Sequence, residues 1–148
     1  MLVKEIMTRA VKTVTPETRL QEVASLMCLN RFSGLPVVES EDKLVGIIAE
    51  QDVLRHLFPS LQDVMGGLSN FDFEGIESEY KKVLPLSAAN LMTSNVITVS
   101  PDTPILKAVS VMARHQFRRI QVTEGDKLVG IISLGDIHRA IFMKSFSG

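Results

Sequence analysis

The chain has 148 residues and a formal net charge of −1, with 45% hydrophobic and 22% charged residues, so it can form one folded domain and is neither disordered nor collagen-like. Its single cysteine, Cys28, excludes an intramolecular disulfide and a cysteine-cluster metal site, and the near-neutral charge gives no support for nucleic-acid binding. No apolar run approaches the ~18–20 residues of a membrane span, and the charged N-terminal residues do not resemble a signal peptide. We therefore expect a soluble cytoplasmic protein without membrane insertion.

An internal repeat organises the sequence. Residues 7–18, MTRAVKTVTPET, correspond to residues 92–103, MTSNVITVSPDT, and the hexapeptide KLVGII occurs at 43–48 and again at 127–132. Two units of similar design usually pack about a pseudo-twofold axis, because each has one apolar face that it cannot bury alone. The predicted organisation is a first repeat at 1–58, a linker at 59–86 and a second repeat at 87–148.

Each repeat is predicted to begin with a strand followed by a helix. The β-branched runs VKTV (11–14) and VITV (96–99) predict the strands. Thr18, with a glutamine three residues later, and Thr103, followed by Pro104 at the first helical position, predict the helix starts. The apolar residues that recur at helical spacing are Leu20, Val23, Ala24 and Met27 in the first repeat and Ile105, Ala108, Val109 and Met112 in the second.

A hairpin and a second helix complete each repeat. The runs GLPVVE (34–39) and RIQVTE (119–124) are each joined by a short polar turn to KLVGII, which predicts a β-hairpin. Helices are then predicted to begin near Asp52 and Asp136. The order strand, helix, strand, strand, helix, found twice, predicts an α/β (α+β) fold of two βαββα repeats packed about a pseudo-twofold axis, with a partly helical linker between them.

The linker 59–86 carries a helical pattern of its own. Met65-Gly66-Gly67 breaks the segment, whereas FEGIESEYKKVL (73–84) predicts a helix that ends before Pro85, with Glu77 and Lys81 spaced for an ion pair. One interpretation is a connecting helix packed on the outside. The other is a segment that docks a partner or gates a site.

The motifs of the two repeats together resemble a known family. The pattern T-V-x-P-x-T near the start of each repeat and G-I-I-S-L-G-D-I at 130–137 resemble the CBS (cystathionine β-synthase) domain, and two in tandem resemble a Bateman module. The resemblance covers nearly the whole chain except 59–86. It implies two CBS repeats in a disc-like module that often forms a homodimer, binds AMP, ADP, ATP or S-adenosylmethionine in clefts between the repeats, and regulates an effector protein.

Ser133 and Asp136 match the Ser/Thr-x-x-Asp motif of that family. A helix N-terminus offers free N–H groups to a phosphate, and a carboxylate in its first turn can accept hydrogen bonds from ribose hydroxyls. The resemblance implies that Asp136 contacts the ribose and that Ser133 lies near phosphate. The alternative is that the two residues only form a capping box, and both roles can coexist.

The first repeat departs from this motif. Its counterpart is Ala49-Glu50-Gln51-Asp52, in which Asp52 keeps the carboxylate but Ala49 lacks the hydroxyl. Glu50 adds a negative charge that disfavours a nearby phosphate. The two ligand sites are therefore expected to be unequal.

The resemblance also implies which residues face each carboxylate from the other repeat. Those expected with Asp136 are Val11, Lys12, Phe32, Ser33 and Gly34, and those expected with Asp52 are Val96, Ile97, Phe117, Arg118 and Arg119.

Arg118 and Arg119 are the most suggestive pair among these residues. They occupy the place where the gamma subunit of AMP-activated kinase, a CBS-domain relative, carries basic residues that touch phosphates. Two guanidinium groups can bind a polyphosphate through forked hydrogen bonds. The alternative is an exposed pair that solvates a strand end or forms a salt bridge with an acid of the linker.

Three functions follow as hypotheses. The first is a regulatory ligand-sensing module that requires no cofactor. The second is a structural or dimerisation module that holds a partner protein without a ligand. The third, an enzyme, is disfavoured because the sequence has no nucleophile elbow, HExxH motif or P-loop, and its three histidines follow no metal-ligand spacing.

Overall fold

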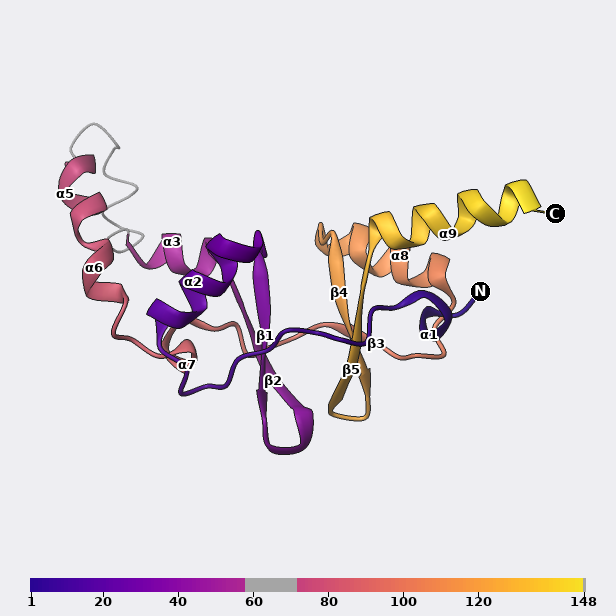
Figure 1. The fold of residues 1–148 in the computed structure, drawn as a ribbon, viewed down its shortest axis with the longest axis horizontal. Helices are drawn as coiled ribbons and strands as arrows, with labels where there is room; N and C mark the ends of the chain where they lie inside the picture. Colours follow the sequence, from indigo (N-terminus) through magenta and orange to yellow (C-terminus); the bar gives the residue numbers. More distant parts are fainter. Residues whose placement is uncertain (58–71, 148) are drawn as a thin grey trace. The chain divides into compact units, whose positions relative to one another are not determined.

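The computed structural model describes residues 1–57 and 72–147 (Figure 1). Two compact units divide the chain. We call them the β1 unit, formed by Thr13–Val38 and Val45–Asn95, and the β4 unit, formed by Met1–Lys12, Glu39–Leu44 and Val96–Gly148. The fold is mixed α+β, as predicted, and each unit has its own hydrophobic core.

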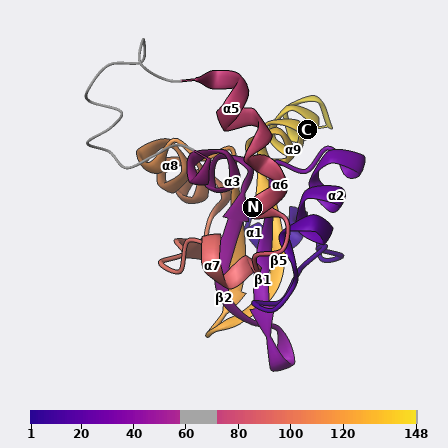
Figure 2. The ribbon, with the colours of Figure 1, turned by 90° about the vertical axis from the view of Figure 1, so that its left-hand side faces the viewer.

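The β1 unit packs helices against a hairpin (Figure 2). Its hairpin is formed by most of strands β1 (Gly34–Glu39) and β2 (Lys43–Ala49); the 3-10 turn that joins them, Ser40–Asp42, is counted with the β4 unit. Its helices are α2 (Leu20–Asn30), α3 (Glu50–His56), α5 (Phe73–Ser78), α6 (Tyr80–Val83) and α7 (Ala88–Leu91). Of the predicted α2 stripe, Leu20, Val23 and Met27 are buried in the core, as expected, whereas Ala24 is half-buried.

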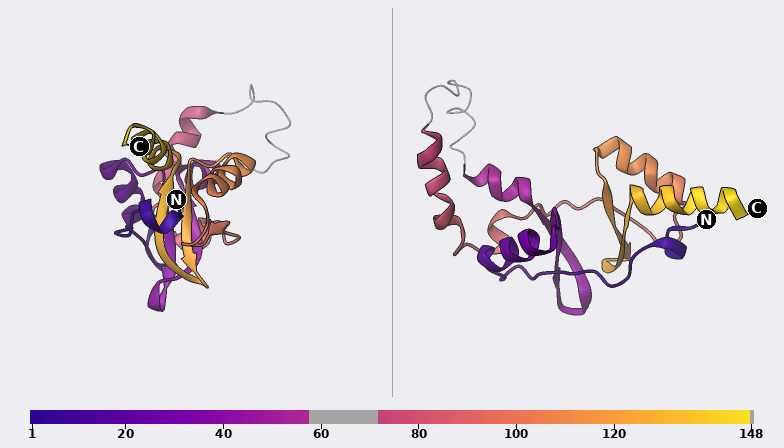
Figure 3. Two further views of the ribbon diagram at one scale, coloured as in Figure 1. Left: turned by 90° about the vertical axis from the view of Figure 1, so that its right-hand side faces the viewer. Right: turned by 45° about the horizontal axis from the view of Figure 1, so that its top comes forward.

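The β4 unit repeats this plan (Figure 3). It contains α1 (Val3–Ile6), β3 (Thr98–Val99), α8 (Ile105–His115), β4 (Arg119–Glu124), β5 (Lys127–Ser133) and α9 (Leu134–Ser147). Strands β4 and β5 are antiparallel, from Arg119 opposite Ser133 to Glu124 opposite Lys127, and β3 runs parallel to β4. The predicted hairpin is confirmed, and so is the core face of α8, where Ile105, Ala108 and Met112 are buried.

Each unit is completed by a segment from the other repeat. Thr8, near the start of the first repeat, exchanges backbone hydrogen bonds of 2.8 and 2.9 Å with Ile131 of β5. Thr93, its counterpart in the second repeat, exchanges bonds of 2.8 and 2.9 Å with Ile47 of β2. Val3 is fully buried in the core of the β4 unit. The repeats of the sequence are therefore interleaved in the fold, a feature that the sequence analysis did not predict.

The exchanged segments explain the glycine in the repeated KLVGII hexapeptide. A Cβ atom on Gly130 would lie 2.7 Å from Met7 Sδ and 2.9 Å from the Thr8 carbonyl oxygen. The same atom on Gly46 would lie 2.7 Å from Met92 Sδ and 3.0 Å from the carbonyl oxygen of the following threonine. Only glycine lets the exchanged segment approach this closely.

The first strand of each repeat is much shorter than predicted. Of VKTV, only Val14 pairs, through a single parallel bridge to Val37, and of VITV only Thr98–Val99 forms a strand. In both repeats the proline-containing turn begins immediately afterwards and removes the chain from the sheet. A segment that pairs on one side and then turns away has few opportunities to extend its ladder.

The predicted helix starts at Thr18 and Thr103 are wrong. Helix α2 begins after Arg19 and α8 after Pro104, which is the N-cap residue rather than the first helical residue. The two threonine hydroxyls instead accept hydrogen bonds from the N–H groups three residues earlier, at 3.0 and 3.1 Å. They close the T-V-x-P-x-T turn and are not available to cap the helices.

The second helices begin slightly earlier than predicted. Helix α3 begins at Glu50 and α9 at Leu134, two residues before Asp52 and Asp136. The two aspartates therefore lie in the first turn of each helix.

The described part of the linker is mostly helical. Helices α5 and α6 cover most of the predicted segment and end before Pro85, as expected. The ion pair found there joins Lys82 and Glu79 at 2.9 Å, and the predicted pair of Glu77 with Lys81 is not among the ion pairs of the described residues. Val83 is buried in the core of the β1 unit, and Met65-Gly66-Gly67 lies outside the described residues.

Candidate ligand site

The junction between β5 and α9 fixes the Ser133–Asp136 motif. The Ser133 N–H donates to Asp136 Oδ2 at 3.1 Å, and the Asp136 N–H donates to Ser133 Oγ at 3.0 Å. This reciprocal pair is a capping box, which confirms the structural interpretation of the motif. It leaves Asp136 Oδ1 outside the box, at the N-terminal end of a 14-residue helix.

Arg118 and Arg119 lie directly beside this motif. The Leu134 N–H donates to the Arg118 carbonyl oxygen at 2.9 Å, and Arg119 is paired with Ser133 across the β4–β5 ladder. Both arginines are exposed. Neither forms an ion pair among the described residues, so the suggested salt bridge to a linker acid is not found there.

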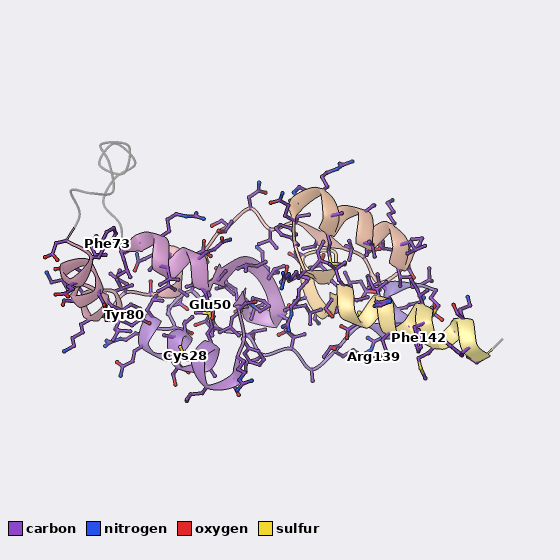
Figure 4. All side chains as sticks on the ribbon, turned by 90° about the horizontal axis from the view of Figure 1, so that it is seen from above. Cys28, Glu50, Phe73, Tyr80, Arg139 and Phe142 are labelled. Carbon is purple, nitrogen blue, oxygen red and sulfur yellow. The ribbon has the colours of Figure 1, made fainter. Side chains whose placement is uncertain are left out.

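The β1 unit holds the weaker counterpart. The Ala49 N–H donates to Asp52 Oδ2 at 2.8 Å. Ala49 has no hydroxyl oxygen to accept a bond from the Asp52 N–H, so only half of the capping box is formed. The Thr93 hydroxyl donates to Asp52 Oδ1 at 3.4 Å. The Glu50 N–H donates to the Ser33 carbonyl oxygen at 2.9 Å, and Figure 4 marks the Glu50 side chain at the beginning of α3. This motif therefore carries two carboxylates.

The predicted site residues are distributed unevenly between the units. Val11, Lys12, Val96 and Ile97 belong to the β4 unit with Asp136, whereas Phe32, Ser33 and Gly34 belong to the β1 unit with Asp52. Within each unit, the motif aspartate lies near the strand start of its own repeat. The predicted approach of each aspartate to strand residues of the other repeat stays a prediction.

Two predicted aromatic residues have local packing partners. Phe117 stacks on His115, with ring centroids 5.3 Å apart and planes inclined by 20°, just before β4 begins. Phe32 packs against the core of the β1 unit. Phe117 is 37% exposed, whereas Phe32 is half-buried.

Two neighbours of the motif aspartates were missed by the sequence analysis. Arg139 Nη1 lies 3.5 Å from Asp136 Oδ1, and Thr93 reaches Asp52 from the exchanged segment. The spacing of three residues within a helix was a usable signal for Arg139. No local signal pointed to Thr93, because its approach depends on the exchange.

Comparison with known proteins identifies the family. The sequence profile of the CBS domain matches residues 3–59 and 88–143. The chain therefore belongs to the CBS domain family and carries two copies of the domain, as the resemblance indicated.

Similar proteins match this chain over most of their own length. The uncharacterised protein MJ1426 of Methanocaldococcus jannaschii is 29% identical over 154 residues, covering 95% of this chain and 91% of its own. The crystal structure of the CBS-pair protein CBSX2 from Arabidopsis thaliana superimposes with a TM-score of 0.79 at 24% identity, covering 99% of this chain and 98% of that one. A second CBSX2 structure, in complex with AMP, gives a TM-score of 0.74 at 24% identity, covering 97% and 98%.

Among the described helices, none combines the length and the apolar character that crossing a membrane requires. Within the same residues, no three histidine, cysteine or acidic side chains gather as a metal ion would need.

Proposed function

We propose that this CBS pair is a regulatory module that senses an adenosyl ligand, such as AMP, ADP, ATP or S-adenosylmethionine. The observation that carries the proposal is the Asp136 carboxylate, which the capping box holds in place while Oδ1 stays outside the box. A carboxylate oxygen held in this way can accept hydrogen bonds from ribose hydroxyls without first being ordered. The AMP-bound CBSX2 structure supports the proposal, because the same fold holds an adenine nucleotide there.

The surroundings of Asp136 suit the rest of such a ligand. The positive end of the α9 dipole favours a negatively charged group at this end of the helix. Arg118 and Arg119 add two exposed guanidinium groups next to Ser133. A nucleotide with its ribose on Asp136 therefore has cationic groups within the same unit for its phosphate.

The Asp52 motif is proposed as the weaker site. Its Oδ1 atom already accepts from the Thr93 hydroxyl, and Glu50 brings a second carboxylate to the helix start. Both features disfavour a phosphorylated ligand, so we expect the two sites to differ in affinity.

We further propose that the module works in the cytoplasm as a homodimer that regulates an effector protein, without catalysis of its own. Helices α8 and α9 expose Leu106, Phe142, Met143 and Phe146, the kind of apolar surface that a second subunit covers. The alternative is a structural module that dimerises and docks a partner without any ligand.

A thermal-shift panel separates these functions. AMP, ADP, ATP, S-adenosylmethionine and a GTP control are added to the wild-type chain, to Asp136→Asn and to Asp126→Asn, a control in the exposed β4–β5 turn. A ligand at ~100 times its Kd stabilises the folded state by about 2.7 kcal/mol. The proposal expects a selective shift with an adenosyl ligand that is lost in Asp136→Asn and kept in Asp126→Asn. No shift with any of them favours the structural module.

A further inference from the structure

The contact between Arg139 and Asp136 involves the carboxylate oxygen that the capping box leaves out. Asp136 Oδ2 accepts from the Ser133 N–H, whereas Oδ1 lies 3.5 Å from Arg139 Nη1. The Arg139 side chain is 72% exposed and that of Asp136 is 29% exposed. Arg139, which Figure 4 labels on α9, thus lies next to the oxygen proposed to bind the ribose.

The same position of the other repeat behaves differently. Arg55 also follows its motif aspartate by three residues, yet it forms no ion pair among the described residues. Asp52 Oδ1 contacts the neutral Thr93 hydroxyl instead. The charge contact is thus specific to Asp136, and Arg55 provides a matched control position.

A guanidinium group in this place can be exchanged for a ligand at little cost. An exposed ion pair contributes only ~0–1 kcal/mol, so a ribose hydroxyl pair can replace Arg139 at Oδ1. The released guanidinium remains one helical turn away, where its fork matches the oxygens of a phosphate. Adenosine has no anionic group to offer it, and S-adenosylmethionine offers a single carboxylate accompanied by two cationic groups, an ammonium and a sulfonium.

We propose that Arg139 determines the specificity of the Asp136 site, by neutralising the carboxylate in the free protein and binding the phosphate of an adenine nucleotide once the ribose occupies Asp136. The inference rests on the proposed function and narrows it to phosphorylated adenosyl ligands at this site. The charges near Asp136 favour a phosphorylated ligand, because three arginines, Arg118, Arg119 and Arg139, lie near a motif that has one carboxylate. In the β1 unit, the corresponding motif has Arg55 and two carboxylates, those of Glu50 and Asp52.

The test compares AMP with adenosine, which lacks the phosphate. Their dissociation constants are measured by isothermal titration, at low and high salt, for the wild-type chain, Arg139→Gln, Arg139→Lys and Arg55→Gln. A lost charge-assisted bond corresponds to about a tenfold weaker affinity for AMP in Arg139→Gln. The affinity of Arg139→Gln for adenosine is expected to stay the same or rise. Arg139→Lys is expected to recover part of the AMP affinity. Arg55→Gln is expected to bind both ligands as the wild-type chain does.

The outcomes separate this inference from the proposed function. An unchanged ratio of AMP to adenosine affinity in Arg139→Gln, or an equal loss of both, overturns the role of Arg139 while the wild-type chain still binds AMP. Tighter binding of S-adenosylmethionine than of AMP at the Asp136 site also overturns it. A wild-type chain that binds none of these ligands contradicts the proposed function itself, and the inference falls with it.

Discussion

At the scale of single residues, one hydroxyl distinguishes the Ser133–Asp136 motif from the Ala49–Asp52 motif. The Ser133 hydroxyl oxygen accepts a hydrogen bond from the Asp136 N–H, whereas Ala49 has no side-chain acceptor for the Asp52 N–H. This difference was visible in the sequence, because Ser-x-x-Asp and Ala-x-x-Asp occupy the same place in the repeat. The contact of Arg139 with Asp136 was not predicted, since helical spacing allows such a pair but does not say which rotamer makes it.

The capping box gives the first stability prediction. Ser133→Ala is expected to lower the free energy of unfolding by about 1 kcal/mol, because it removes the acceptor for the Asp136 N–H. Ala49→Ser is expected to raise it by a similar or smaller amount by completing the box of α3. Urea denaturation monitored by circular dichroism measures both. Ser110→Ala, which removes an exposed hydroxyl from α8, is the control, and an Ser133→Ala effect no larger than that of the control contradicts the prediction.

At the scale of elements, the hairpins were predictable and the first strands were not. Strands β1 and β4 have the predicted bounds, because a short strand-forming run and the polar turn that follows it are local signals. VKTV and VITV have strong β propensity, but strand length also depends on neighbours, and the chain turns away after one or two pairs. The threonines of the following turn match a helix-capping pattern, yet their hydroxyl oxygens accept hydrogen bonds from N–H groups within the turn.

The packing of the exchanged segments predicts a steric effect. Gly130→Ala is expected to destabilise the chain by about 1–3 kcal/mol, because the new methyl group would overlap Met7 and the Thr8 carbonyl oxygen. Chemical denaturation measures the change. Gly135→Ala is the matched control, since its Cβ would lie 3.7 Å from the Ser133 Oγ atom, an ordinary contact. Equal stability of the two variants would show that the segment does not pack as described.

At the scale of the whole molecule, the two repeats are interleaved and not simply consecutive. The segment Met1–Lys12 belongs to the β4 unit, and residues 84–95 belong to the β1 unit. The internal repeat was visible in the sequence, as was the family, because both rest on residue identity. The exchange of the starting segments could not be predicted, because the sequence of such a segment does not indicate which of the two β-hairpins it pairs with.

Interleaving predicts that neither repeat folds alone. A fragment of residues 87–148 lacks the buried Val3 and the paired Thr8, so it is expected to show no cooperative thermal unfolding. Circular dichroism melting of this fragment, with the full chain as control, measures whether a cooperative transition is present. Addition of a peptide of residues 1–12 is expected to restore part of the transition. A cooperative transition of the fragment alone at the melting temperature of the full chain would contradict the prediction.

Binding of an adenosyl ligand through Asp136 is measured by isothermal titration of AMP into the wild-type chain, Asp136→Asn and Asp52→Asn. We expect saturable binding whose affinity at the tighter site falls by about tenfold or more in Asp136→Asn, because the charged acceptor for the ribose is lost, and changes less in Asp52→Asn. An AMP affinity in Asp136→Asn equal to that of the wild-type chain would show that Asp136 does not hold the ligand.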